Sequence, residues 1–330
     1  MPGIPGLRAW WADRPPAAGA AVMATGIVSV SLHLAGYETV SRAALALTVV
    51  GWIALGADFV LRLAVDRRRW VDDARSPGSL TAVAATAVLG TRLSALGQQT
   101  LAEALLALAA LLWPVLLLLV VRHWGRRMPG AVFLGCVATQ GPAVLAATLA
   151  AATRTPWLAH TALVVFWLGL VLYAVALARF DARQVLVGAG DHWIAGGALA
   201  ISALAGARLL VAGDAGMYLW DGDDRHVLRV VTVALLVLDL AWCLVLLAAE
   251  VARPRLGYDL RRWSMVFPLG MTAAATLSVA TAVGVPWLHG PGRVLTWVAV
   301  GAWLWVAAGA LGAHAGAVKG ATSVRSTARR

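Results

Sequence analysis

Two arginines stand inside long apolar stretches of the sequence, where a charged side chain is costly. Arg92 lies in TAVAATAVLGTRLSALG and Arg208 in ALAISALAGARLLVAG. A central arginine costs on the order of 2.5 to 3.5 kcal/mol on membrane-insertion scales, and such residues usually face a bundle interior or a water-filled path. Positive charge at this depth attracts anions, and His33 in a third apolar stretch can join it and add sensitivity to pH. An interfacial position or pairing with an acid is the alternative for each arginine.

Other reactive residue types do not form a recognisable catalytic or metal-binding pattern. The seven histidines include no HExxH motif and no pair spaced to bind haem, and GxSxG is absent. Cys136 and Cys243 each lie in an apolar stretch, so neither a disulfide framework nor a CxxC metal site is available. We therefore expect no enzyme active site, no cofactor and no metal, and we interpret both cysteines as packing residues.

The composition is that of a multispanning membrane protein. The chain is 61% hydrophobic and 13% charged, with a mean hydropathy of +0.79. A bilayer core of about 30 Å needs about 20 apolar residues per helix. This criterion gives ten candidate spans: 18–36, 43–65, 79–97, 101–121, 130–151, 158–178, 191–212, 226–250, 264–284 and 293–317.

No connection between these spans is long enough to fold separately, which predicts a single membrane domain over residues 18–317. Residues 1–17 are expected to form a cytoplasmic N-terminal segment without a cleavable signal peptide, and residues 318–330 a basic cytoplasmic tail. In a soluble protein, the net charge of +11 would suggest nucleic acid. Here the main partner is the lipid bilayer, and we expect no nucleic-acid partner.

The positive charges separate by side of the membrane. Alternate connections and the two ends carry 19 Lys and Arg residues, whereas the other connections carry four, which are Arg42, Arg154, Arg225 and Arg293. Because positive charge is retained on the cytoplasmic side, both termini are predicted in the cytoplasm of a cell-membrane protein. An even number of spans requires the same result.

Odd-numbered and even-numbered spans differ in composition. The five odd spans hold 16 Ser and Thr residues and the five even spans hold four, while the even spans carry the bulky apolar runs. Helices in lipid pack closely through Gly, Ala, Ser and Thr. We predict five inner helices, each followed by an outer helix that shields it. The interior is either simply tightly packed or lines a narrow path.

We expect different partners for the two aspartates inside the even spans. Asp58 and Arg62 lie four residues apart on one helix face and are expected to pair. Asp239 has no local partner, and Arg229 or an inner-helix hydroxyl can meet it.

Two motifs in the odd spans resemble a known family. VMATGIVSVSLHLAG (22–36) resembles the first-helix signature, and RRWSMVFPLGMTAAAT (261–276) the ninth-helix signature, of the tellurite-resistance/C4-dicarboxylate transporter family. This family includes bacterial TehA proteins, yeast malate and sulfite transporters and plant slow-type anion channels. The resemblance covers nearly the whole chain. It implies an all-α integral membrane fold of ten transmembrane helices, arranged as five hairpins around a central pore, and a homotrimer.

The same resemblance implies a gate. A ninth-helix Phe occludes the pore in that family, and the matching residue is Phe267, followed by Pro268; Phe133 in the fifth span is the reserve candidate. An aromatic ring among small residues forms a short apolar constriction that can be dry when closed. Pro268 kinks its helix and frees carbonyls that Thr272 can satisfy, and Thr272 and Thr276 are expected to line the pore. Packing of Phe267 beside a kink is the alternative.

These observations favour an anion channel or transporter that passes small inorganic anions or C4-dicarboxylates through a pore with an aromatic gate. The alternative is a proton-coupled carrier of dicarboxylate, sulfite or tellurite. Alternating-access carriers usually show two repeats, whereas the pattern here has five, which favours a channel-like path.

Overall fold

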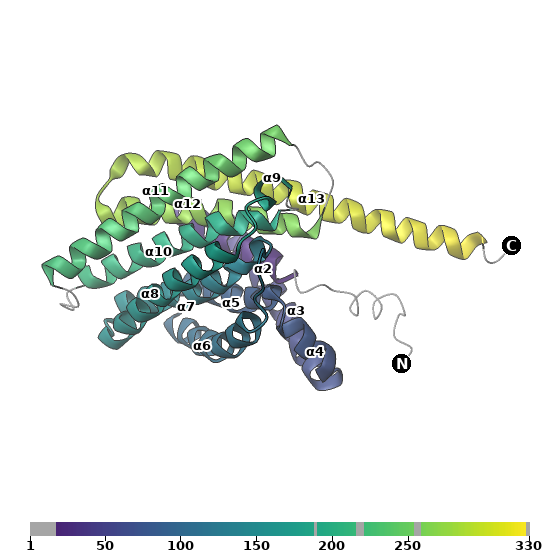
Figure 1. The fold of residues 1–330 in the computed structure, drawn as a ribbon, viewed down its shortest axis with the longest axis horizontal. Helices are drawn as coiled ribbons and strands as arrows, with labels where there is room; N and C mark the ends of the chain where they lie inside the picture. The colour runs from purple at the N-terminus through teal and green to yellow at the C-terminus, as the bar shows by residue number, and fades with distance from the viewer. Residues whose placement is uncertain (1–17, 188–189, 216–220, 254–258, 328–330) are drawn as a thin grey trace.

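The computed structural model describes residues 18–187, 190–215, 221–253 and 259–327, and Figure 1 shows them as a bundle of helices. Within these ranges the secondary structure is helical, apart from one isolated bridge between Met128 and Phe180. The predicted N-terminal segment 1–17 lies outside the described residues. Helix α13 continues to Thr327, into the region that we assigned to the tail.

Five helices form a closed inner ring. They are α2 (Ala18–Leu34), α5 (Thr81–Ala95), α7 (Leu134–Thr153), α10 (Ile194–Asp214) and α12 (Trp263–Val283). Each packs against the next one in this order, and α12 packs back against α2. Small residues allow the close approach: a Cβ placed on Gly141 would lie 3.1 Å from that of Ala87, and one on Gly270 would lie 2.9 Å from Ile27 Cγ2.

Five outer helices surround this ring. They are α3 (Glu38–Val65), α6 (Gln99–Val121), α8 (Pro156–Arg179), α11 (Gly222–Ala252) and α13 (His289–Thr327). Each packs against the inner helix before it and also touches the next inner helix. The short helices α4 (Arg67–Ala74) and α9 (Gln184–Val187) lie in two of the connections.

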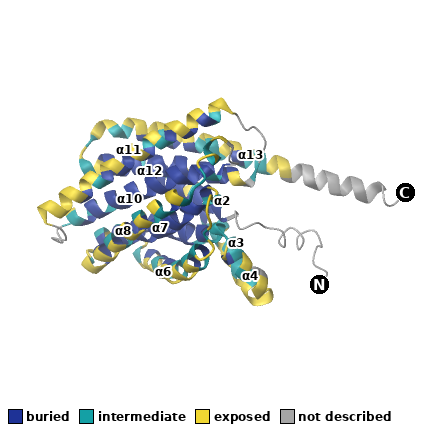
Figure 2. Ribbon diagram, viewed as in Figure 1, coloured by how far each residue is buried: buried dark blue, intermediate teal, exposed yellow. Residues whose placement is uncertain are grey.

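Burial separates the two sets of helices, as the Ser and Thr pattern predicted (Figure 2). In an apolar stretch of 18 residues within each of the inner spans 130–153, 191–214 and 263–283, between 83 and 94% of the residues are buried, against 11 to 33% in such stretches of the outer helices. Eight of the ten helices are long and apolar enough to cross a membrane; α2 and α5 are shorter. Cys136 and Cys243 are buried, as expected of packing residues.

All five outer helices begin earlier than predicted, by two to five residues. Helix α3 begins at Glu38 and α11 at Gly222, instead of at residues 43 and 226. Glu38 lies in the first turn of α3, and the Asp221 side chain accepts a hydrogen bond from Asp224 N at the start of α11. Acidic side chains stabilise the amino-terminal end of a helix, which hydropathy does not detect.

Tryptophans of outer helices bond to threonines of the next inner helix. The Nε1 atoms of Trp52, Trp113 and Trp303 donate to the Oγ1 atoms of Thr86, Thr139 and Thr25, each over 2.9 Å. Each threonine hydroxyl also donates to the carbonyl four residues earlier in its own helix. We call these contacts the Trp–Thr bonds. They show that part of the Thr content of the inner helices faces outward.

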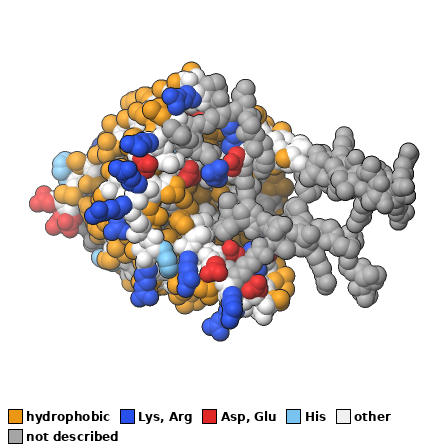
Figure 3. Space-filling view, turned by 45° about the vertical axis from the view of Figure 1, so that its right-hand side comes forward, with side chains coloured by type: hydrophobic (Ala, Val, Ile, Leu, Met, Phe, Trp, Pro, Cys, Tyr) orange, Lys and Arg blue, Asp and Glu red, His pale blue; other side chains and the backbone are white. Residues whose placement is uncertain are grey.

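The basic end of the bundle is the end that holds α4, α9 and the arginine-rich connections; in Figure 3, Lys and Arg side chains (blue) spread across the part of it turned to the viewer. Four inner helices begin at this end with a 3₁₀ turn. The turns are η1 (Pro77–Leu80), η2 (Gly130–Phe133), η3 (Asp191–Trp193) and η4 (Leu260–Arg262). Another 3₁₀ turn, η5 (Pro286–Leu288), leads into α13 at the opposite end.

Turns with a left-handed residue join inner to outer helices at that opposite end. Gly36, Gly97 and Gly284 have φ values of 91°, 81° and 72°, and Arg154 holds the corresponding place after α7 with φ 53°. A left-handed residue closes a helix by bonding back to its last turn, and glycine adopts this conformation without steric cost. Arg154 is the exception among the four.

We expect Arg154→Gly to stabilise the protein by about 1 kcal/mol, because it removes the Cβ strain of a left-handed residue. Thermal unfolding of purified protein in detergent measures the effect. Arg154→Ala is the matched control, since it shortens the side chain but keeps Cβ and should give no comparable gain. Equal unfolding midpoints for Arg154→Gly and Arg154→Ala would contradict the strain argument.

Candidate anion pathway

A small cavity lies where the five inner helices meet. Every inner helix contributes to its wall, which consists of Ile27, Val30, Ala87, Val88, Thr91, Gly141, Val144, Ile201, Leu204 and Met271. Thr91 provides the one side-chain hydroxyl in this lining. The described wall is therefore almost wholly apolar, and polar groups have to be sought beyond its two ends.

Phe267 lies one helical turn from Met271, towards the basic end. Residues four apart share a helix face, so Phe267 lies on the same face of α12 as this cavity residue. Its side chain is fully buried. A Cβ on Gly197 of α10 would lie 3.0 Å from Phe267 Cε1 and 3.0 Å from Pro268 Cγ. The absence of a side chain at Gly197 therefore makes room for Phe267 and Pro268.

Phe133 has a different environment. Its ring packs against Tyr173 and Phe180, with centroids 5.2 and 5.3 Å apart, so it contacts the end of the outer helix α8. Thr272 and Thr276 do not line the small cavity. Thr272 Oγ1 donates to Asp239 Oδ1 on α11 over 3.2 Å, and Thr276 Oγ1 donates to the Thr272 carbonyl over 2.7 Å.

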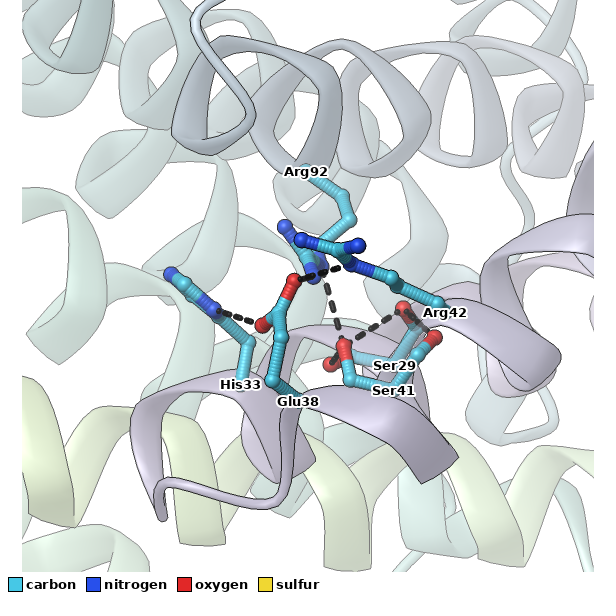
Figure 4. A network of polar contacts seen from close by, with 6 residues as sticks. All are labelled: Ser29, His33, Glu38, Ser41, Arg42 and Arg92. Atoms are coloured by element: carbon cyan, nitrogen blue, oxygen red, sulfur yellow. Dashed lines mark hydrogen bonds and ion pairs between the residues drawn. The ribbon is translucent and has the colours of Figure 1, made fainter.

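Arg92 belongs to a polar cluster centred on Glu38, which Figure 4 shows from close by. Arg92 is 1% exposed; its Nη2 lies 2.7 Å from Glu38 Oε1, and its Nε donates to Ser41 Oγ over 3.0 Å. His33 Nδ1 lies 2.7 Å from Glu38 Oε2, and Arg42 Nε lies 2.9 Å from Glu38 Oε1. The structure thus brings His33 and Arg92 together on the Glu38 carboxylate. Of the two expectations for Arg92, pairing with an acid is the one observed.

Ser29 and Ser41 connect this cluster to the packing of α2 on α3. Each hydroxyl donates to the carbonyl of the other residue over 2.7 Å. Both side chains are fully buried. The Glu38 cluster therefore joins α2, α3 and α5 at the end of the bundle opposite the basic end.

Arg208 differs from Arg92 in having no acidic neighbour. It lies on α10, in the half of the helix away from the basic end, and is partly buried. Its Nε atom is buried without a hydrogen-bond partner, and no ion pair joins Arg208 to any residue that the structure describes. A partly buried cation without a carboxylate among the described residues needs an anion or water as its counterpart.

Asp58, Arg62 and Asp239 have the partners that sequence reasoning considered. Arg62 Nε lies 2.9 Å from Asp58 Oδ2, which confirms the expected pair. Asp239 meets the inner-helix hydroxyl of Thr272, while Arg229 donates to the Val283 carbonyl instead. Asp239 is fully buried, and its Oδ2 has no hydrogen-bond partner among the described residues.

Sequence reasoning missed Glu38, the centre of the cluster. Glu38 and Arg92 are 54 residues apart, so no local pattern joins them. The Glu38–Arg42 spacing of four residues at the start of α3 was the available signal, because it marks an acid at a helix start beside a cation.

A shell of apolar outer helices around a closed inner ring, with cations inside the ring's apolar helices, defines a multi-pass membrane protein. A model of the SLAC1 family, described as voltage-dependent anion channel, matches residues 14–311. The chain belongs to this family, which includes TehA-like members, as the two motifs indicated. Family membership indicates an anion channel or transporter rather than an enzyme. No curated protein gave a match.

We expect Glu38→Ala to destabilise the protein by about 1 to 3 kcal/mol, because Arg92 would remain buried without its carboxylate. Thermal unfolding in detergent is the measurement. Arg42→Ala removes an exposed partner of the same carboxylate and should cost less than about 1 kcal/mol. If Glu38→Ala unfolded at the temperature of Arg42→Ala, Glu38 would not hold the cluster together.

Proposed function

We propose that this protein passes small anions through the centre of the inner ring, with its ten long helices crossing the membrane as five hairpins. The observation that carries the proposal is the isolated Arg208 on an inner helix, since a mobile anion is the counterpart that the described residues do not provide. Arg92 has Glu38 as a counterion. Arg208 is therefore the stronger candidate for anion attraction.

Phe267 is the proposed gate. An apolar cavity narrower than a hydrated anion is a barrier to ions without any charged plug. Phe267 lies on the same face of α12 as the cavity residue Met271, and its ring lies against Gly197 of α10, so movement of this one ring would widen the path. The contacts of Phe133 with Tyr173 and Phe180 make it the weaker candidate.

The expected setting is a cell membrane with the basic end in the cytoplasm, because arginine-rich connections are retained on that side. Arg92, Arg208 and His33 then lie in the outer half of the membrane, where they can draw anions towards the cavity. We further expect Thr272 and Thr276 to line the path. This requires α12 to rotate about its axis when the gate opens. Inorganic anions such as chloride, nitrate, sulfite or tellurite, and C4-dicarboxylates, are the proposed substrates, and a homotrimer is the proposed assembly.

Phe267→Ala should raise anion conductance by about tenfold, equivalent to about 1.4 kcal/mol off the barrier. Flux of chloride, nitrate and malate into proteoliposomes, normalised to inserted protein, measures this and ranks the substrates. Phe133→Ala is the matched control, because Phe133 is an equally buried phenylalanine whose ring packs against Tyr173 and Phe180 at the end of α8. Unchanged flux in Phe267→Ala would remove this residue from the gate, and a gain in Phe133→Ala alone would assign the gate to Phe133.

Arg208→Gln should lower anion flux about tenfold and reduce the preference for anions over cations, because it removes the unpaired charge from the path. Reversal potentials in a chloride gradient report the preference. Arg208→Lys keeps the charge and should retain most of it. A reversal potential unchanged in Arg208→Gln would make Arg208 a structural residue.

A proton-coupled carrier is the second candidate, and Asp239 is the observation that favours it. This carboxyl is buried, has one oxygen without a donor, and contacts Thr272 on the helix that carries Phe267. A carboxyl in such a place can take up and release a proton during transport.

For this second candidate, an inward proton gradient should drive anion accumulation in the wild type, whereas Asp239→Asn should allow only downhill flux. Asp223→Asn, at an exposed position of α11, is the control. Wild-type flux that does not respond to the proton gradient would eliminate the carrier.

A further inference from the structure

An open groove separates α3 from α5 on the side of the bundle near the basic end. The two helices touch through Glu38 and Arg92 and again through Trp52 and Thr86. Beyond Trp52 they diverge, and Figure 1 shows α3 and α4 leaning away from the other helices. Among the groove-lining residues are Gly56, Phe59, Trp70, Thr81, Ala82 and Leu108.

The groove has a volume of about 840 Å³, within the range of about 300 to 1,000 Å³ typical of ligand sites. Its walls are mainly apolar, and the neighbouring side chains Ile53, Val60 and Leu61 are more than half exposed. These exposed side chains belong to a helix long and apolar enough to span a membrane. Hydrocarbon is therefore the surrounding solvent, and water would be unfavourable against such walls.

The end of the groove near α4 is polar. Arg62 bridges Asp58 and Asp73, with 2.9 Å to each carboxylate. Trp70 also lines this end and meets Phe59 edge-on, with centroids 5.3 Å apart. The Trp70 indole N–H has no acceptor within the described part of the chain. The apolar walls therefore end in a polar cluster formed by Asp58, Arg62 and Asp73, which matches a ligand with a hydrocarbon body and polar atoms at one end.

Charge beyond the polar end indicates the sign of the ligand. Arg67 and Arg68 follow at the start of α4, are exposed, and make no ion pair with residues that the structure describes. Arg62 cannot serve the ligand in the same way, because it is already paired with two carboxylates. The cations available here favour an anionic headgroup.

We propose that this groove binds an anionic glycerophospholipid from the leaflet at the basic end. Its acyl chains lie between α3 and α5, its ester oxygens lie near Trp70, and its phosphate faces Arg67 and Arg68. Thr81, Ala82 and the other groove-lining residues of α5 occupy the back of a helix whose Ala87, Val88 and Thr91 line the central cavity. The lipid thus packs directly behind the wall of the proposed path.

Gly56 and Gly301 provide a matched test. A Cβ added at either glycine would meet no atom within 4 Å, and Gly56 lines the groove whereas Gly301 lies on α13. Wild type, Gly56→Trp and Gly301→Trp are reconstituted in nanodiscs of mixed phosphatidylglycerol and phosphatidylcholine, and retained lipid is counted by native mass spectrometry. Compared with Gly56→Trp, the wild type and Gly301→Trp should each retain one additional phosphatidylglycerol molecule per subunit. Equal retention in all three would overturn the proposal.

Further variants test the headgroup and the occupant. Ala82→Phe fills the groove from the opposite wall and should lose the same lipid if Gly56→Trp fails to fold. The double variant Arg67→Gln/Arg68→Gln should lose the preference for phosphatidylglycerol over phosphatidylcholine; an unchanged preference would overturn the anionic assignment. Oxidative cross-linking of Gly56→Cys between two subunits would overturn the lipid in favour of a second copy of the chain. Lipid retention is measured without transport, so failure of the lipid proposal can be distinguished from failure of the proposed anion transport.

Discussion

Hydrocarbon offers no hydrogen bonds, and the structure depends on meeting this constraint inside the protein. The Trp–Thr bonds satisfy indole donors of three outer helices by using threonines of the next inner helix. Glu38 does the same for the buried Arg92, and Ser29 and Ser41 exchange bonds with each other's backbone. With most polar groups satisfied in this way, the few that are not become informative. Arg208, Asp239 and Trp70 are among the residues that keep an unpartnered buried atom, as Arg92 does at Nη1, and these three lie where an anion, a proton or a lipid is proposed.

The close packing of the inner helices determines the size of the space at the centre of the ring. Gly141 and Gly270 bring neighbouring backbones together, which leaves a small cavity with apolar walls instead of an open channel. An ion gains nothing from such a wall, so in the proposed anion path selection would occur at the cations beyond the wall, and conduction would require the constriction to widen. Close packing thus holds the inner helices together and leaves only a small cavity at their centre.

The course of the chain could be predicted from sequence more fully than the directions of its side chains. Hydropathy located eight helices long and apolar enough to cross a membrane and the shorter α2 and α5, and Ser and Thr content separated inner from outer helices, because both properties belong to single segments. The direction of Thr272 could not be predicted, since α12 is buried on all sides from Trp263 to Ala280 and its pattern contains no exposed face. The partner of Arg92 lies on another helix 54 residues away. The groove depends on the angle between α3 and α5, which no local sequence pattern encodes.

Closure of the ring also bears on how the fold can be built. Helix α12 meets α2 as any inner helix meets its neighbour, and each hairpin repeats the same short left-handed turn where the structure describes it. No hairpin therefore occupies a position that requires it to come first. A circularly permuted chain that starts at α5 and ends with the α2–α3 hairpin would retain every contact between helices. The fold is in this sense a closed cycle of similar pairs of helices.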